Sequence, residues 1–435
     1  MLKFKTSFIA IIFFIFLACP LPFAQAKTIK IATYNVENLF DLNKSGNEYI
    51  EYIPNGIFNW NKNTFSKKIN NISTVIKDLN ADIIALQEIE SKVAMKALKQ
   101  ELISRALDYK YTAIASSRNT TVKCALFSKW PITNIEEVFV YNMKMRNILK
   151  VHIRIDSFPL IIYINHWKSK RGPESLRIQS AISLKEDIDK LEAGTDFIIL
   201  GDFNANYDEY KSITKIKKLN NTQGITGINH ILKTINDSEM VDEDFLSEQK
   251  TNSYLYNLWL EIEKEQRWSY DSYRDKDSPD SIILSYGLYD DKGISYIDNS
   301  FNKFMPNYLF RKGKIFRWQK TKKGSGMHTG FGYSDHLPIF AMFSTKPFIR
   351  LKKPKQNIKE QPAPKEKPTK DMHGIIDPNT ATKKELMAIK GIGDKLSDKI
   401  INDRPYTSIN DLLRVNGIGK KKHESFRKYF KIQKQ

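Results

Sequence analysis

The sequence has few cysteines and no long apolar segment, and both absences exclude classes of protein. Its two cysteines, Cys19 and Cys124, cannot build a disulfide framework. No stretch approaches the ~20 apolar residues that a bilayer-spanning helix needs. Acidic residues number 49 against 69 Lys and Arg, which gives a formal net charge of +20. Because 12% of the residues are aromatic, this excess of cations does not describe a wholly disordered polycation.

The N-terminus has the pattern of an export signal. Two lysines precede an apolar run at residues 8–19, and Ala24-Gln25-Ala26 offers small residues for cleavage. This pattern predicts a signal peptide at residues 1–26, cleaved after Ala26, and a secreted or periplasmic protein without stable membrane association. An uncleaved anchor and lipidation at Cys19 are the alternatives. Export would leave Cys124, which we expect to be buried and free, as the one remaining cysteine.

At ~150 residues per domain, 435 residues predict two or three domains. From residue 28 to about 343, strand-like and helix-like segments alternate around what we expect to be large sheets. Apolar, β-branched runs predict strands at 28–35, 82–86, 149–155, 160–165, 196–200, 281–284 and 339–343. Helical periodicity predicts helices at 67–79 and 173–191, with another at 254–265 inside a polar insertion at 206–266.

The C-terminal region differs in composition. Lysine and proline dominate residues 346–373, which predicts an extended charged linker before an ordered segment at 374–435. Residues 346–435 hold 23 Lys and Arg against 10 Asp and Glu, so most of the chain's net charge lies there.

The ordered C-terminal segment repeats a short glycine motif. Gly391-Ile392-Gly393 recurs as Gly417-Ile418-Gly419, each between two helical patterns, and Lys395, Lys420 and Lys421 flank the turns. Glycine permits positive φ, and the unpaired N–H groups that begin the next helix form a ready phosphate site.

This repeat resembles the tandem helix-hairpin-helix module, most closely the DNA-binding domain of bacterial competence receptors. The segment from Asp377 to Thr382 and the dipeptide Arg404-Pro405 match that subgroup. The resemblance implies a small all-α domain that grips the duplex backbone without reading sequence. The residues it implies for DNA binding are Gly391, Gly393, Lys395, Gly417, Gly419, Lys420 and Lys421. A pair of helix-capping glycines, or a protein-binding hairpin, is the alternative.

Polar motifs stand at the ends of the predicted strands in the larger region. They are Thr33-Tyr34-Asn35-Val36-Glu37-Asn38, Leu86-Gln87-Glu88, Asn165-His166-Trp167-Lys168-Ser169-Lys170, Gly201-Asp202-Phe203-Asn204, Asp280-Ser281-Ile282-Ile283-Leu284-Ser285 and Ser334-Asp335-His336-Leu337-Pro338. In this order they resemble the endonuclease/exonuclease/phosphatase superfamily, which includes pancreatic deoxyribonuclease and abasic-site endonucleases. The resemblance implies an α+β fold for a catalytic domain at 27–345, a four-layer α/β/β/α sandwich.

The resemblance also implies a metal. A phosphodiester resists attack because its oxygens are negative, and Mg²⁺ held by hard oxygen ligands offsets the developing charge. Glu88 matches the main metal ligand, with Asn35 and Asp335 close by; Mn²⁺ and Ca²⁺ are alternatives to Mg²⁺. Glu37 stands where several members have aspartate.

The remaining motif residues match catalytic positions of the superfamily. His336 fits the general base, because an imidazole near its intrinsic pKa suits that role at neutral pH. Asp280 would hold the far side of that ring, although the segment before it lacks the apolar residue usual in the family. Asp202 and Asn204 match the pair that positions the nucleophile and supports the phosphate. His166 matches the second histidine, which resembles the deoxyribonuclease branch.

Four cations are candidates to hold flanking phosphates: Lys168, Lys170, Arg171 and Arg146. The alternative is that they are solvated cations at strand ends. Together the motifs predict an exported, metal-dependent nuclease that hydrolyses DNA with little sequence preference, with RNA left open as a substrate and a monomer expected. A phosphatase or phospholipase of the same fold, and a non-catalytic receptor for DNA uptake, are the alternatives.

Overall fold

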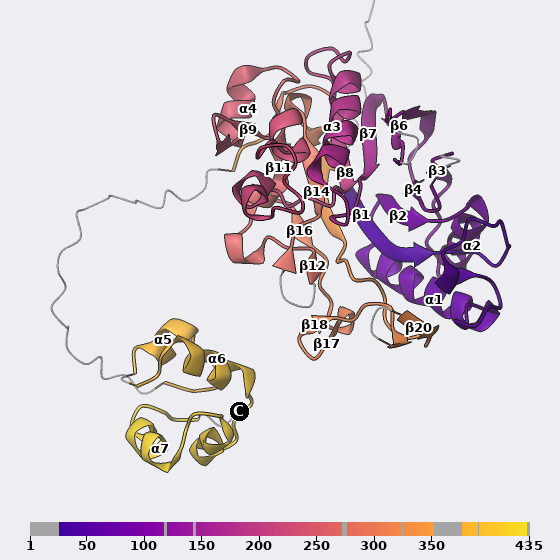
Figure 1. The fold of residues 1–435 in the computed structure, drawn as a ribbon. Helices are drawn as coiled ribbons and strands as arrows, with labels where there is room; N and C mark the ends of the chain where they lie inside the picture. The colour runs from indigo at the N-terminus through magenta and orange to yellow at the C-terminus, as the bar shows by residue number, and fades with distance from the viewer. Residues whose placement is uncertain are drawn as a thin grey trace, which may run out of the picture. The chain divides into compact units, whose positions relative to one another are not determined.

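The computed structural model describes residues 26–116, 120–141, 145–271, 276–322, 325–351, 376–389 and 391–432. The predicted signal peptide, apart from Ala26, and residues 352–373 of the predicted linker lie outside these ranges. The chain divides into two compact units, Met1–Lys352 and Lys353–Gln435 (Figure 1). Within the described ranges, no helix is both long and apolar enough to span a bilayer.

Two sheets form the centre of the first unit. The first sheet has the strand order β15-β21-β1-β2-β4-β3, with β16 also paired to β21, and the second has the order β11-β14-β8-β7-β6-β5. The strands of the first sheet are β15 (Ser295–Tyr296), β21 (Ile339–Ser344), β1 (Thr28–Leu39), β2 (Ile83–Ile89), β4 (Lys123–Ser128), β3 (Tyr111–Ile114) and β16 (Asn302–Lys303). Those of the second are β11 (Tyr256–Asn257), β14 (Asp280–Leu284), β8 (Phe197–Asp202), β7 (Phe158–His166), β6 (Ile148–Ile155) and β5 (Ile132–Val138).

Among the described residues, four two-stranded sheets accompany the large sheets. They are β9 (Ile235–Asn236) with β10 (Glu239–Met240), β12 (Tyr270–Asp271) with β13 (Lys276–Asp277), β17 (Phe310–Arg311) with β18 (Lys314–Ile315), and β19 (Lys320–Lys322) with β20 (Ser325–His328).

Alternation along the strands builds four layers. In β1, Ile29 and Ile31 enter the core between the sheets, whereas Ala32 and Tyr34 enter the core beneath the helices α1 (Lys62–Leu79) and α2 (Lys92–Ser104). The helix α3 (Glu174–Ile188) and the π-helical turn η4 (Gly227–Ile231) cover the outer face of the second sheet. Successive side chains of a strand point to opposite faces, so one buried strand serves two cores. The α/β/β/α sandwich of the prediction is confirmed.

The predicted helix at 254–265 is wrong. Residues Tyr256–Asn257 form β11, paired with β14, and short 3-10 turns follow as η5 (Leu258–Glu261) and η6 (Lys264–Gln266). The Asn257 side chain accepts the N–H of Trp259, and the Trp259 indole donates to the carbonyl of Asp280 at 2.7 Å. The pairing of β11 with β14 and the bond from Trp259 to Asp280 override the local helical preference. The helix of this insertion is instead α4 (Glu243–Gln249).

The second unit is all helical in its described elements. They are α5 (Lys383–Met387), α6 (Asp394–Asn402), the 3-10 turn η9 (Ile409–Arg414) and α7 (Lys420–Arg427). Leu386 and Ile392 of the first repeat share one core with Leu412 and Ile418 of the second. The corresponding positions of the two repeats are therefore buried together, which explains why a single copy would lack a core.

Candidate active site

Strand register brings three of the predicted residues into one row. The parallel pairing of β7 and β8 sets His166 opposite Asp202, and the antiparallel pairing of β8 and β14 sets Asp202 opposite Asp280. Asn35 reaches the same carboxylate from the other sheet, with its Nδ2 2.9 Å from Asp202 Oδ2. The ends of both sheets therefore meet at Asp202, which is 2% exposed.

The backbone around this point is constrained. Gly201 has φ +126°, and a Cβ at that position would lie 2.1 Å from the carbonyl oxygen of Asn165. Glu88 and Asn204 adopt positive φ values of 69° and 50° although they are not glycines. Such conformations cost free energy and gather at functional sites, where surrounding structure holds them.

Asn35 links two carboxylates through one amide group. Its Nδ2 donates to Glu88 Oε1 at 3.2 Å as well as to Asp202, while its Oδ1 accepts the N–H of Glu37 at 3.0 Å. Turning the amide over would set its oxygen against two carboxylates and lose the bond from Glu37. The sequence predicts Asn35 near a metal ion; here its amide nitrogen faces the two acids and holds them together.

His336 and Asp280 form a buried pair. His336 Nδ1 lies 2.7 Å from Asp280 Oδ2, which also accepts the hydroxyl of Ser269 at 2.6 Å. Burial disfavours the imidazolium, but the charge and hydrogen bond of Asp280, with Asp335 and Asp202, outweigh it and raise the pKa of His336 well above its usual range. His336 Nε2 lies 3.9 Å from Asp335 Oδ1.

His166 has the opposite protonation preference. Its Nε2 lies 3.7 Å from Glu88 Oε1 and 3.6 Å from Asp202 Oδ2. Burial, followed by the charges of Arg146 and His336, lowers the pKa of His166 well below its usual range. The surroundings of the two histidines therefore shift their pKa values in opposite directions, which is the pattern expected of an acid–base site.

Carboxylates crowd the space between the histidines. Burial raises the pKa of Glu37 and of Asp202 to about 7, and burial together with the charge of Asp335 raises that of Glu88. Arg317 offsets part of this charge by pairing with Glu37 and, at 3.0 Å, with Asp335.

Buried carboxylates that raise one another's pKa form a donor set of hard oxygens. Hard oxygen donors suit Mg²⁺ or a similar divalent cation, so the residues fit the metal that the sequence predicts. The donor atoms of Asp202, Asp280 and His336 also lie within 4.8 Å of one another.

Sequence reasoning missed two cations beside the predicted acids. Arg317 comes from a segment without a motif, and its pairing with Glu37 shows why that position carries an acid. Lys68 is fully buried on α1 and donates to the carbonyl of Tyr333 at 2.9 Å. Burial lowers the pKa of Lys68 to about 8 despite the nearby Glu37 and Asp335. A lysine at a core-facing position of an amphipathic helix is visible in the sequence, so this pattern could have identified Lys68.

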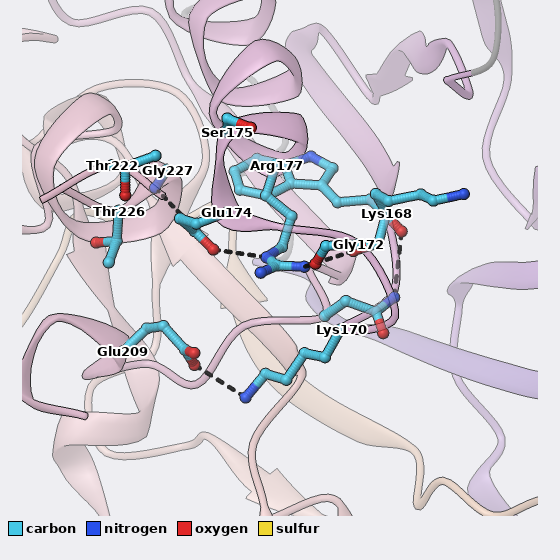
Figure 2. Close-up of polar contacts among 12 residues, drawn as sticks. Lys168, Lys170, Gly172, Glu174, Ser175, Arg177, Glu209, Thr222, Thr226 and Gly227 are labelled. Atoms are coloured by element: carbon cyan, nitrogen blue, oxygen red, sulfur yellow. Dashed lines mark hydrogen bonds and ion pairs between the residues drawn. The ribbon is translucent and has the colours of Figure 1, made fainter. Parts of the chain in front are cut away.

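The predicted phosphate-binding cations occupy different settings. Arg146 lies beside His166: its Nη1 donates to the carbonyl of Trp167 at 3.5 Å. Arg171 is exposed, and Lys168 is half-buried with its side chain extending away from α3 (Figure 2). Lys170 differs, because its Nζ pairs at 3.0 Å with the fully buried Glu209.

A buried ion pair supports the loop that follows His166. Arg177 Nε donates to Glu174 Oε2 at 2.7 Å, and both side chains are 0% exposed. The other Glu174 oxygen accepts the N–H of Gly227 at 2.9 Å. Figure 2 shows the Arg177 guanidinium directed at this loop, where its Nη1 donates to the carbonyls of Lys168 and Gly172 at 3.1 and 3.3 Å. The loop's conformation therefore depends on charges buried beneath it.

The glycine repeats of the second unit begin two helices as predicted. Gly393 precedes α6 and Gly419 precedes α7, both with extended backbone and without a side-chain cap. Gly391 and Gly417 have φ +99° and +111°. Lys395, Lys420 and Lys421 are exposed in the first turns of these helices. Each turn thus presents helix N-terminal N–H groups beside cationic side chains, a suitable arrangement for a phosphate backbone.

Comparisons with known proteins agree with both resemblances. Residues 30–237 match the model of the Endonuclease/Exonuclease/phosphatase family, and residues 372–431 match that of the Helix-hairpin-helix motif. A search of curated proteins gives no match.

Solved structures are similar over about three quarters of this chain. A D. rerio TDP2 humanized by 14 mutations is 14% identical, with 73% of this chain and 98% of that chain covered and a TM-score of 0.44. An endonuclease/exonuclease/phosphatase family protein from Leptotrichia buccalis is 14% identical, covering 72% and 98% at a TM-score of 0.43. One from Bacteroides thetaiotaomicron is 11% identical, covering 74% and 99% at 0.42.

Proposed function

Because the chain carries an Endonuclease/Exonuclease/phosphatase family domain joined to a helix-hairpin-helix motif, we propose that it is an exported, metal-dependent nuclease that hydrolyses DNA phosphodiester bonds with little sequence specificity. The observation that carries this proposal is the convergence of Asn35, His166 and Asp280 on the buried carboxylate of Asp202, at the ends of both sheets. It supports a phosphodiesterase, and the glycine repeats support DNA as the substrate.

In the proposed reaction, His336 takes the proton of the attacking water. Asp280 accepts from Nδ1, so Nε2 is the nitrogen left for that proton. Asp280 raises the pKa of His336, so the ring must first lose a proton to act as a base, and the rate should rise with pH. Asp202 and Asn204 orient the water and the phosphate.

The metal ion would be held by Glu88 and Asp335. When bound, a divalent cation supplies positive charge that offsets the charge developing on the phosphate oxygens. Asn35 keeps Glu88 in place by donating to its Oε1, and Arg317 does the same for Asp335. His166, whose pKa is lowered and which lies close to Glu88, would act on the phosphate or leaving-group side.

The second unit would grip the duplex backbone through its two Gly-x-Gly turns. Helix N-termini and lysines contact phosphates without reading bases, which accounts for the low sequence specificity that we propose. Export rests on the N-terminal segment, and mass spectrometry of the mature protein should find Lys27 as its first residue.

The proposal is tested with plasmid DNA, Mg²⁺ and the mature protein. We expect nicking and degradation that stop when a chelator is added, and a loss of at least about 100-fold in the His336→Ala variant. His152→Ala is the matched control, because His152 lies on β6, pairs with Glu136 and has no place in the site. Full activity in His336→Ala would overturn the mechanism; release of phosphate from small monoesters without DNA cleavage would indicate a phosphatase.

A further inference from the structure

A second group of carboxylates lies outside the catalytic site. Glu243 begins α4, Glu261 ends η5, and Asp298 stands in the turn between β15 and β16. Their donor oxygens all lie within 4.8 Å of one another, and Asp298 is only 4% exposed. Three acids from separate segments therefore converge in a largely buried position.

Several polar atoms in this group are unsatisfied among the described residues. Asp298 Oδ2 accepts the N–H of Leu351 at 2.6 Å, but its Oδ1 is buried and has no partner. Glu261 Oε2 accepts the hydroxyl of Tyr296 at 2.5 Å, and its Oε1 is likewise buried without a partner. The hydroxyl of Tyr289, a residue that is 6% exposed, also lacks a hydrogen-bond partner. Burial, together with charges that include that of Glu261, raises the pKa of this hydroxyl. Buried polar groups without partners are rare in native proteins, and a bound ion is one arrangement that would satisfy these atoms.

The charges around this position favour a cation as the ligand. Burial, with the nearby Glu243 and Asp298, raises the pKa of Glu261 to about 8. Arg350 Nε lies 3.9 Å from Glu243 Oε2, and the same guanidinium also pairs with Asp244. An oxygen-lined, negative and buried position matches the coordination chemistry of a hard divalent ion.

We propose that Ca²⁺ binds between Glu243, Glu261 and Asp298. Calcium accepts six to eight oxygens in irregular geometry, whereas Mg²⁺ demands a near-octahedral set, and carboxylates from a helix start, a 3-10 turn and a loop suit the former. The ion joins the insertion after β8 to the end of the first unit, because Leu351 bonds to Asp298 and Phe348 packs on Tyr289 with their rings 4.8 Å apart. This role is structural and is independent of the proposed nuclease reaction.

The test is calcium-dependent thermal unfolding of the full mature chain after treatment with a chelator. Millimolar Ca²⁺ should raise the melting temperature by about 3 °C in the wild-type protein. The rise should persist in Glu88→Gln, which weakens ion binding at the catalytic site, and in Glu263→Gln, an exposed neighbour that serves as the matched control. Terbium bound in place of Ca²⁺ should luminesce when Tyr289 and Tyr296 are excited.

The Glu261→Gln variant distinguishes a calcium site from a group of carboxyls that share a proton and bind no ion. The neutral amide relieves repulsion, so this variant should melt at or above the wild-type temperature without Ca²⁺, yet gain nothing when Ca²⁺ is added. Asp298→Asn should behave alike and serves if Glu261→Gln does not fold. A wild-type melting temperature that Ca²⁺ leaves unchanged, or an undiminished rise in both variants, would overturn the proposal.

Discussion

The buried pair between Glu174 and Arg177 offers a direct test of how the loop after His166 is held. Glu174→Ala removes the carboxylate that accepts Arg177 Nε at 2.7 Å and the N–H of Gly227 at 2.9 Å, and both charged side chains are 0% exposed. The guanidinium would remain buried without its counter-charge. We therefore expect a large loss of stability.

The expected loss of stability combines two free-energy costs, and both arise from the removal of the Glu174 carboxylate. An uncompensated buried charge costs about 3–5 kcal/mol, and a buried N–H left without an acceptor costs about 1–3 kcal/mol. Because Gly227 and Arg177 lose the same group, the two costs overlap, and we expect the free energy of unfolding to fall by about 4 kcal/mol. Replacing both partners, as in Glu174→Gln with Arg177→Met, should recover at least about 1 kcal/mol of this loss.

The assay is urea unfolding followed by tryptophan fluorescence, with Asp189→Ala as the matched control at the C-terminal cap of the same helix. Asp189 pairs with Lys185 on the surface, and its loss should cost less than about 0.5 kcal/mol. In activity assays, Arg177→Met should raise KM more than it lowers kcat, because Arg177 bonds to the carbonyl of Lys168 and not to the catalytic groups. If Glu174→Ala costs no more than Asp189→Ala, the reasoning about the buried charge is refuted.

Three further predictions concern the catalytic residues and the second unit. Asp280→Asn should lower kcat by about 100-fold or more and shift the acidic limb of the pH–rate profile to lower pH, because Asp280 raises the pKa of His336; an unmoved limb would contradict this coupling. Gly201→Ala should lower the melting temperature and abolish activity, because its Cβ would lie 2.1 Å from the Asn165 carbonyl oxygen; a wild-type melting curve would refute it. Truncation after Lys352 should weaken DNA binding and reduce the slope of log affinity against log salt by about 3, if each lysine of the Gly-x-Gly turns contacts one phosphate, as a filter-binding titration would show. An unchanged slope would count against the second unit as the DNA grip.

The truncation point illustrates what structure adds to sequence. Composition places the linker at 346–373, but Phe348 and Leu351 still contact the first unit. A cut at residue 346 would remove those contacts, so a loss of stability would be confused with a loss of DNA binding. The second unit, Lys353–Gln435, begins after them.

The site could be predicted where local pattern determines it. The pattern of apolar strands showed polar residues at their ends, and the resemblance to a family selected Asn35, Asp202 and Asp280 among them; the observed register sets Asp202 opposite Asp280. The resemblance to a family supplied their order. The failed helix at 254–265 shows the limit, because the Trp259 side chain bonds to the backbone of β14, 21 residues further along the chain.

The charged residues that support the site could not be paired with their partners from local sequence pattern. Arg317 bonds to Glu37 across 280 residues, and Glu174 bonds to Gly227 across 53. Neither spacing matches a helix turn or a strand alternation, so nothing in a local window relates the partners. The sequence reveals such a pair only when one member stands at an unexpected position, as Lys68 does on the buried face of α1.

The placement of charge explains why the two units would act as one enzyme. A site of converging carboxylates repels a polyanion until a metal ion binds, so the first unit alone should associate weakly with DNA. Residues 346–435 carry 23 Lys and Arg against 10 Asp and Glu, and a tethered cationic module raises the local concentration of duplex. The second unit would help the enzyme to bind DNA but would supply none of the reacting groups. Its removal should therefore raise KM. Substitutions at His336 or Asp280 should act on kcat, and a variant carrying both kinds of change should show the product of the two effects.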